Sequence, residues 1–177
     1  MIQLVSLTPQ ECSIALDSLQ DCRAFGQLLA QGIRNTVPCT IGLVGTLGAG
    51  KTQLVKFIAQ SLGANPEDVM SPTFVLMHPL DTNPEIHHID AYRIRDSDEF
   101  LELGIEELFE QPVLTIIEWA DRFVDCMPRN TLWIELLTQD PLSEQRTARI
   151  TNLNRFPLLN NHLAQSLGWK TQTESPQ

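Results

Sequence analysis

Short apolar runs alternate along the chain with stretches whose apolar side chains recur at helical spacing. The runs at residues 39–44 and 113–117 carry no charge, which is typical of parallel strands that are buried on both faces. Weaker apolar or alternating patterns predict extended segments elsewhere, at residues 2–7, 73–80, 86–90, 131–138 and 146–152. We expect the last two to be late strands that can pair antiparallel with each other.

Four stretches have the spacing of amphipathic helices. The first, residues 19–33, follows Ser18 and carries Asp21 three residues after it, which predicts an N-cap at Ser18. The other predicted helices cover residues 53–62, 97–109 and 157–167. Because strands and helices alternate, the sequence predicts an α/β fold with a mainly parallel central sheet. The length of 177 residues suits a single domain, residues 1–170, with a flexible tail at residues 171–177.

Acidic residues dominate the charged positions and narrow the classes of function. The chain has 12 Lys and Arg against 22 Asp and Glu, a net charge of −10, and 42% hydrophobic residues. It is too apolar for a disordered acidic chain, and it repels polyphosphate backbones, so we expect no stable binding of nucleic acid by this chain alone. No signal peptide or membrane-spanning run is evident, and the four cysteines lack CxxC spacing. We therefore expect a reduced, cytoplasmic protein.

The strongest motif is the segment GTLGAGKT at residues 45–52, which fits G-x-x-x-x-G-K-[ST] at every fixed position. Its glycines permit a backbone path on which successive N–H groups surround a phosphate, and the following helix directs its positive end at the same anion. In this pattern Lys51 reaches the β- and γ-phosphates and the Thr52 hydroxyl binds Mg²⁺. The residues predicted to bind the phosphates of ATP are Gly45, Leu47, Gly48, Ala49, Gly50, Lys51 and Thr52. A glycine-rich turn with a surface lysine is the alternative.

Two acidic residues end apolar strands and are candidates for the catalytic and metal-binding carboxylates. Glu118 follows residues 113–117, and Asp90 ends the segment IHHID. A buried acid is costly without a cation or a hydrogen-bond partner, so both positions favour a role beside Mg²⁺. The alternative for each is a strand-end acid that caps backbone N–H groups.

The remaining candidates carry weaker signals. Thr73, in the segment SPTF, can place a hydroxyl over the γ-phosphate as switch segments do, or it can be an ordinary loop hydroxyl. Trp119 follows Glu118 directly and either shields the nucleotide from water or fills the core. His87 and His88 are adjacent in a predicted strand and point to opposite faces, so one metal ion cannot easily take both.

The segments GTLGAGKT, SPTF, HIDAYRI and IIEWADR, in this order between residues 45 and 122, resemble the bacterial TsaE family. That family consists of small P-loop ATPases needed to make threonylcarbamoyladenosine in tRNA. The resemblance implies a P-loop NTPase-like fold of three layers, hydrolysis of ATP with Mg²⁺, and association with the TsaD–TsaB complex, which transfers the threonylcarbamoyl group.

By motif position, the resemblance also implies roles for individual residues. Lys51 and Thr52 take the phosphate and metal roles, and Glu118 is the metal-site carboxylate. Asp90 matches the acid of the family's HxDxYR segment, and Trp119 matches the tryptophan that follows the glutamate.

A third residue, Thr73, matches the family's switch-like threonine, but two positions depart from the family pattern. Thr46 stands where the family usually has Asp in the loop, and Cys22 stands where the first helix often carries Thr. The second departure leaves the residues of the purine pocket unassigned.

Three classes of function compete for this sequence. The first is an ATPase that acts as a nucleotide switch on its partners. The second is a non-hydrolysing scaffold that binds ATP, because no residue is identified that positions the attacking water. A small-molecule kinase ranks lowest, because such enzymes close an arginine-rich lid over the phosphate, and only Arg122 and Arg129 follow Glu118 closely.

Overall fold

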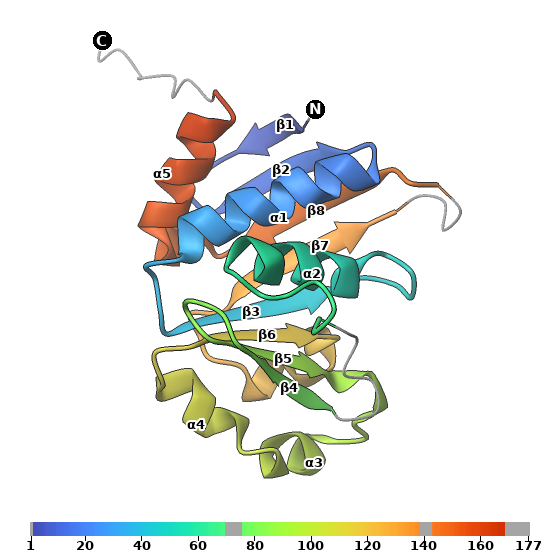
Figure 1. Cartoon of the computed structure of the whole chain (residues 1–177), viewed down its shortest axis with the longest axis vertical. Helices are drawn as coiled ribbons and strands as arrows, with labels where there is room; N and C mark the ends of the chain where they lie inside the picture. The colour runs from blue at the N-terminus through green and yellow to red at the C-terminus, as the bar shows by residue number, and fades with distance from the viewer. Residues whose placement is uncertain (1, 70–75, 139–142, 169–177) are drawn as a thin grey trace.

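The structure is a computed structural model, and it describes residues 2–69, 76–138 and 143–168. These residues form one sheet of eight strands with helical segments on both faces (Figure 1). In chain order the strands are β1 (Gln3–Leu7), β2 (Glu11–Leu16), β3 (Cys39–Val44), β4 (Met77–Leu80), β5 (Ile86–Asp90), β6 (Leu114–Glu118), β7 (Leu132–Leu137) and β8 (Arg146–Thr151). Their order in space is β1-β2-β8-β7-β3-β6-β5-β4.

The centre of the sheet is parallel and its two edges are antiparallel. Strands β7, β3, β6 and β5 run parallel, whereas β8, β2 and β1 extend one edge antiparallel and β4 closes the other. In the register of the central strands, Glu118 at the end of β6 lies between Leu43 of β3 and Asp90 of β5. The loop that follows β3 and two strand-end acids therefore meet at one edge of the sheet.

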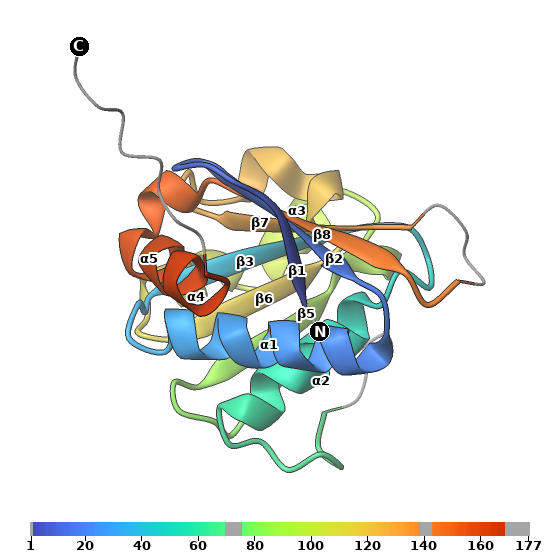
Figure 2. The same cartoon turned by 90° about the horizontal axis from the view of Figure 1, so that it is seen from above.

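Helical segments cover the sheet on both sides, which gives three layers. One face carries α1 (Leu19–Ile33), α2 (Lys51–Ser61) and α5 (Pro157–Ser166), which follows the 3-10 turn η3 (Leu153–Arg155). The other face carries α3 (Ser97–Glu102), α4 (Ile105–Glu110) and the 3-10 segments η1 (Ala91–Arg93) and η2 (Ala120–Cys126). Figure 2 shows α1 and α2 together on one side of the sheet and η2 on the opposite side.

Each face has its own apolar core. The larger core lies under α1, α2 and α5 and contains Phe25, Leu29 and Ile58. The smaller core lies under η2, α3 and α4, where the rings of Phe100 and Phe123 stack with centroids 4.5 Å apart. The split into two cores explains why β3 and β6 are apolar on both faces.

The α/β prediction and most of its elements are confirmed. The helix at residues 19–33 begins as expected, because the Ser18 hydroxyl accepts the Asp21 N–H at 3.2 Å. The two late strands, β7 and β8, pair antiparallel with each other. The helix expected at residues 53–62 starts earlier, at Lys51, and ends at Ser61.

The prediction of one helix at residues 97–109 is wrong. The chain forms two short helices there, α3 and α4, and Gly104 between them has a φ of +72°, which ends the first helix. Strand β2 was not predicted, although Cys12, Ile14 and Leu16 alternate as buried positions along it.

Parts of two predictions fall outside the described residues. Of the extended segment predicted at residues 73–80, the structure describes β4 and Leu76. The tail predicted at residues 171–177 lies outside the described part of the chain. Within the described part, no helix is both long and apolar enough to cross a membrane.

Candidate functional site

The loop between β3 and α2 is built on glycines with positive φ. Gly45, Gly48 and Gly50 have φ values of +146°, +79° and +102°. A Cβ atom on Gly45 would lie 2.7 Å from the Leu136 carbonyl oxygen, so this position also needs glycine for space. α2 begins directly at Lys51, and no side chain of the described residues caps its first turn. The N–H groups of that turn are therefore available to an anion.

Lys51 lies folded against this loop. Its Nζ donates to the carbonyl oxygens of Gly45 at 2.7 Å and Thr46 at 3.0 Å, and it sits 3.6 Å from the centre of the Trp119 ring. Burial lowers the pKa of the Lys51 ammonium, and three nearby carboxylates oppose that shift by favouring the charged form. Phosphate oxygens are stronger acceptors for an ammonium than neutral carbonyls, so a bound phosphate can draw Lys51 away from the loop.

Two buried carboxylates face the loop, as the sequence predicts. Glu118 is 3% exposed and Asp90 is 5% exposed. The Thr52 hydroxyl donates to Glu118 Oε2 at 2.9 Å, and His88 Nε2 lies 2.8 Å from Glu118 Oε1. Asp90 Oδ1 accepts the Tyr92 N–H at 3.1 Å and thus caps η1, which is the alternative role considered for this acid. The hydrogen-bond partners of Glu118, by contrast, are the side chains of Thr52 and His88.

Trp119 lines the site and also contacts the smaller core. Its backbone is left-handed, with a φ of +61°, an uncommon conformation for a residue other than glycine. The indole lies over Lys51 and beside the Tyr92 ring, with centroids 5.0 Å apart. Backbone outliers of this kind cluster at functional sites, where the surrounding structure holds them in place.

Most of the predicted site residues line one cavity of about 410 Å³. Its walls are Leu47, Gly48, Gly50, Lys51, Thr52, Gln53, Lys56, Asp90, Tyr92, Glu118 and Trp119. Of the other predicted residues, Gly45 supplies a carbonyl oxygen to the ammonium, Ala49 lines a neighbouring pocket, and Thr73 lies outside the described residues. Gln53 and Lys56 of α2 were not predicted, because the sequence pattern does not distinguish a polar helix residue that lines a cavity from one that faces solvent.

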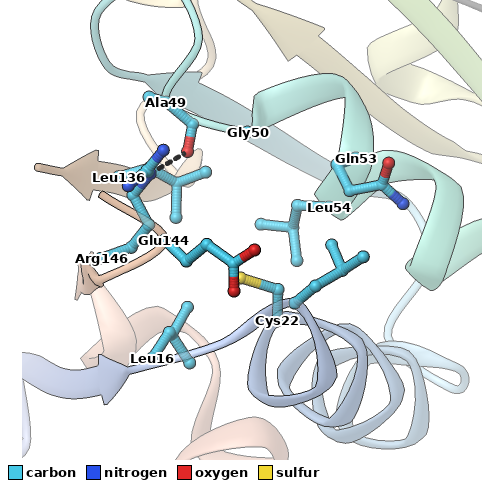
Figure 3. Close-up of a pocket in the computed structure, with 10 residues that line it drawn as sticks. Leu16, Cys22, Ala49, Gly50, Gln53, Leu54, Leu136, Glu144 and Arg146 are labelled. Atoms are coloured by element: carbon cyan, nitrogen blue, oxygen red, sulfur yellow. Dashed lines mark hydrogen bonds between the residues drawn. The ribbon is translucent and has the colours of Figure 1, made fainter. Parts of the chain in front are cut away.

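A second pocket, of about 170 Å³, adjoins the loop on the side of α1 (Figure 3). It is lined by Leu16, Leu19, Cys22, Ala49, Gly50, Gln53, Leu54, Leu136, Glu144 and Arg146. Figure 3 shows Cys22 of α1 and Leu54 of α2 directed into the hollow. Arg146 Nε donates to the Ala49 carbonyl oxygen at 3.0 Å, which fixes one wall of the pocket to the loop. The walls come from distant parts of the sequence, so local patterns could not predict this pocket.

Arg122 joins the two segments that carry the acids. Its Nη1 donates to the carbonyl oxygens of Ala91 at 2.8 Å and Tyr92 at 2.6 Å, and its Nη2 donates to Ile94 at 2.7 Å. The guanidinium at the start of η2 therefore binds the backbone of η1 and the residue after it. This contact links the segment IIEWADR to the segment HIDAYRI and fixes the chain immediately after Asp90.

Comparisons with known proteins identify one family and several relatives. The family model "Threonylcarbamoyl adenosine biosynthesis protein TsaE" matches residues 16–148. Three relatives share the name tRNA threonylcarbamoyladenosine biosynthesis protein TsaE. The Treponema pallidum relative is 33% identical over 122 residues, which cover 69% of this chain and 85% of that protein. The Aquifex aeolicus relative is 37% identical over 117 residues, which cover 64% and 80%. The Haemophilus influenzae relative is 27% identical over 156 residues, which cover 88% and 95%.

The fold also matches a solved structure. The crystal structure of YdiB from Bacillus subtilis aligns with a TM-score of 0.69 and 24% sequence identity. The alignment covers 89% of this chain and 96% of the YdiB chain. At this level of identity the likeness describes the fold.

Replacing Arg122 by alanine should loosen the segment after Asp90. The Arg122→Ala variant loses three donors to backbone carbonyls, so we expect its free energy of unfolding to fall by about 1–2 kcal/mol. Amide hydrogen exchange at Tyr92 and Ile94 should quicken by about tenfold, measured by NMR or mass spectrometry. Arg129→Ala, which removes an exposed arginine further along, is the matched control. Unchanged exchange at both amides in Arg122→Ala would show that the guanidinium does not hold this segment.

Proposed function

The chain belongs to the TsaE family of threonylcarbamoyl adenosine biosynthesis proteins, and on that premise we propose that it is a Mg²⁺-dependent ATPase. In this proposal it acts as a nucleotide switch on the TsaD–TsaB threonylcarbamoyltransferase complex in the cytoplasm, during the modification of tRNA. The observation that carries the proposal is one cavity in which a glycine loop and Lys51 face Glu118 across the Thr52 hydroxyl.

The loop supplies what the phosphates of ATP need. Backbone N–H groups of the loop and of the first turn of α2 surround the anion, and Lys51 exchanges its two carbonyl acceptors for phosphate oxygens. A chain with a net charge of −10 repels ATP at long range. Binding therefore depends on these few groups at close quarters.

The donor set around Thr52 fits Mg²⁺. Hydroxyl and carboxylate oxygens are the ligands that this cation prefers, and Thr52 and Glu118 place one of each within 2.9 Å of each other. Bound Mg²⁺ would neutralise charge on the β- and γ-phosphates during transfer to water. Thr52 would bind the cation directly, and Glu118 would hold it through an oxygen or an intervening water.

Asp90 and Thr73 complete the proposed machinery. Asp90 borders the cavity beside Glu118, so its carboxylate can accept hydrogen bonds from a water near the γ-phosphate. Thr73, outside the described residues, keeps in this proposal the role of a switch-like hydroxyl near the γ-phosphate. Trp119 and Tyr92 line the cavity with neighbouring rings, and in this proposal they restrict water in the site.

The pocket of Figure 3 is the proposed site of the adenine base. It lies beside Gly50 and Gln53, so a nucleotide whose phosphates occupy the loop can extend into it without a change in the loop. Its walls are largely apolar, as base-binding pockets are, and Arg146 and Glu144 provide polar groups at one side. Cys22 lies in this pocket, where the family often carries Thr.

Loss of the Lys51 charge should weaken nucleotide binding. In Lys51→Met the buried stem remains and the charged donor is lost, so we expect the Kd for ADP, measured by calorimetry, to rise by about 10- to 100-fold. Arg34→Ala removes one positive charge from an exposed residue after α1 and controls for the change in net charge. An ADP affinity equal in all three proteins would refute the role of Lys51.

Hydrolysis should depend on Glu118 more than binding does. Glu118→Gln should lower Mg²⁺-dependent ATP turnover by about 100-fold, while the Kd for ADP measured in EDTA changes by no more than about threefold. Turnover is measured with and without TsaD–TsaB, and Glu67→Gln is an exposed control. If wild-type protein binds ATP and joins the complex without turnover in either condition, the non-hydrolysing scaffold replaces the ATPase.

Filling the pocket of Figure 3 should weaken binding of the base without weakening binding of the phosphates. Cys22→Trp should raise the Kd for ADP by about tenfold or more and leave the Kd for inorganic pyrophosphate nearly unchanged, because only ADP has a base to place. The control is Cys126→Trp, at a half-buried position on the opposite face of the sheet. A Cys22→Trp variant that binds ADP normally would place the base elsewhere.

A further inference from the structure

A fully buried histidine lies directly beneath the proposed metal site. His88 is in β5, and its exposed fraction is 0%. Because side chains alternate along a strand, His88 shares its face with Ile86 and Asp90, and in the register of the sheet it lies beside Ile116 of β6. Ile86 and Ile116 belong to the larger apolar core, so this imidazole lies between that core and the carboxylates at the ends of β5 and β6.

The imidazole makes one short polar contact. His88 Nε2 lies 2.8 Å from Glu118 Oε1, and the other carboxylate oxygen, Oε2, accepts the Thr52 hydroxyl at 2.9 Å. An ionised carboxylate only accepts hydrogen bonds, so Nε2 carries the hydrogen in this contact. His88 Nδ1 is buried and has no hydrogen-bond partner among the described residues. Within the described part of the chain, the polar atoms of the ring are therefore directed at Glu118 alone, which packing by itself does not require.

The neighbouring histidine shows what an ordinary position on this strand looks like. His87 points to the opposite face, its side chain is 16% exposed, and its Nε2 lies 3.0 Å from Glu85 Oε1. Glu85 is itself exposed, so that pair lies at the surface and away from the cavity. The two adjacent histidines therefore differ in environment: His87 pairs with an exposed carboxylate, and His88 with a buried one.

We propose that His88 is a positioning residue that fixes the carboxylate of Glu118 for Mg²⁺ binding. With Oε1 held by the imidazole, Oε2 remains directed at Thr52. The Thr52 hydroxyl then donates its hydrogen to Glu118 and leaves its oxygen lone pairs for the cation. Without the imidazole, Oε1 has no hydrogen-bond donor among the described residues, and the carboxylate is free to rotate toward the ammonium of Lys51. The inference rests on the proposed function, because it concerns the metal of that same site.

The test measures the effect of Mg²⁺ on protein already loaded with ADP, by calorimetric titration with Mg²⁺ alone. His88→Met keeps approximately the volume of the ring and removes the donor, and we expect the titration midpoint to rise by about tenfold or more. His88→Gln places an amide N–H near the position of Nε2 and should restore the midpoint to within about threefold of wild type. His87→Met is the matched control and should leave the midpoint unchanged, and the Kd for ADP in EDTA should stay the same in all variants.

The outcomes separate the inference from the function on which it rests. A folded His88→Met protein with an unchanged Mg²⁺ midpoint overturns the inference and leaves the proposed function standing. If wild-type protein binds ADP without any effect of Mg²⁺, the proposed function and the inference fail together. Should His88→Met not fold, His88→Asn and His88→Gln decide: both bury an amide, but the shorter Asn side chain does not reach Glu118. Equal midpoints in these two variants would then overturn the inference.

Discussion

Glu118 is the point at which three elements of the fold meet. A buried carboxylate at the end of a central strand needs hydrogen-bond donors around it, and this one receives them from Thr52 at the start of α2 and from His88 in β5. The parallel register of β3, β6 and β5 makes this possible, because it brings the ends of these strands to one edge. The position of α2, and with it the glycine loop, is thus tied to the charge at the end of β6.

Two arginines stabilise the backbone around Glu118 by donating hydrogen bonds to carbonyl oxygens. Arg122 binds the carbonyl oxygens of η1, and Arg146 binds the carbonyl oxygens of Ala49 and Gly48 in the loop. Both come from segments distant in sequence from the backbone they hold. The chain has only 12 Lys and Arg residues, and two of them hydrogen-bond to the backbone around the site. Arg122 holds the segment after Asp90, and Arg146 holds the glycine loop.

Local signals in the sequence predicted the parts of the site that a single segment defines. The glycine loop, Lys51, Thr52 and the strand-end acids follow from motif spacing and from uncharged runs. Contacts between segments could not be predicted in this way, which is why the roles of Arg122 and Arg146 emerge only from the structure.

Two other differences between the sequence prediction and the structure concern single residues. The sequence shows that His87 and His88 face opposite sides of a strand, but it does not show which one meets the buried carboxylate of Glu118. The prediction of one helix at residues 97–109 did not take Gly104 into account. The left-handed backbone of this residue interrupts the helix, although apolar side chains recur at helical spacing on both sides of it.

The indole of Trp119 has a consequence for optical spectroscopy. An aromatic ring 3.6 Å from an ammonium experiences that charge in its electronic transitions, and Lys51 must leave the ring if it turns toward a phosphate. Trp133 packs over Gly42 on the body of the sheet and does not line the cavity, and Trp169 lies outside the described residues. Trp119 is therefore an intrinsic fluorophore beside the glycine loop. We expect its emission to change when the Lys51 ammonium moves away from the ring.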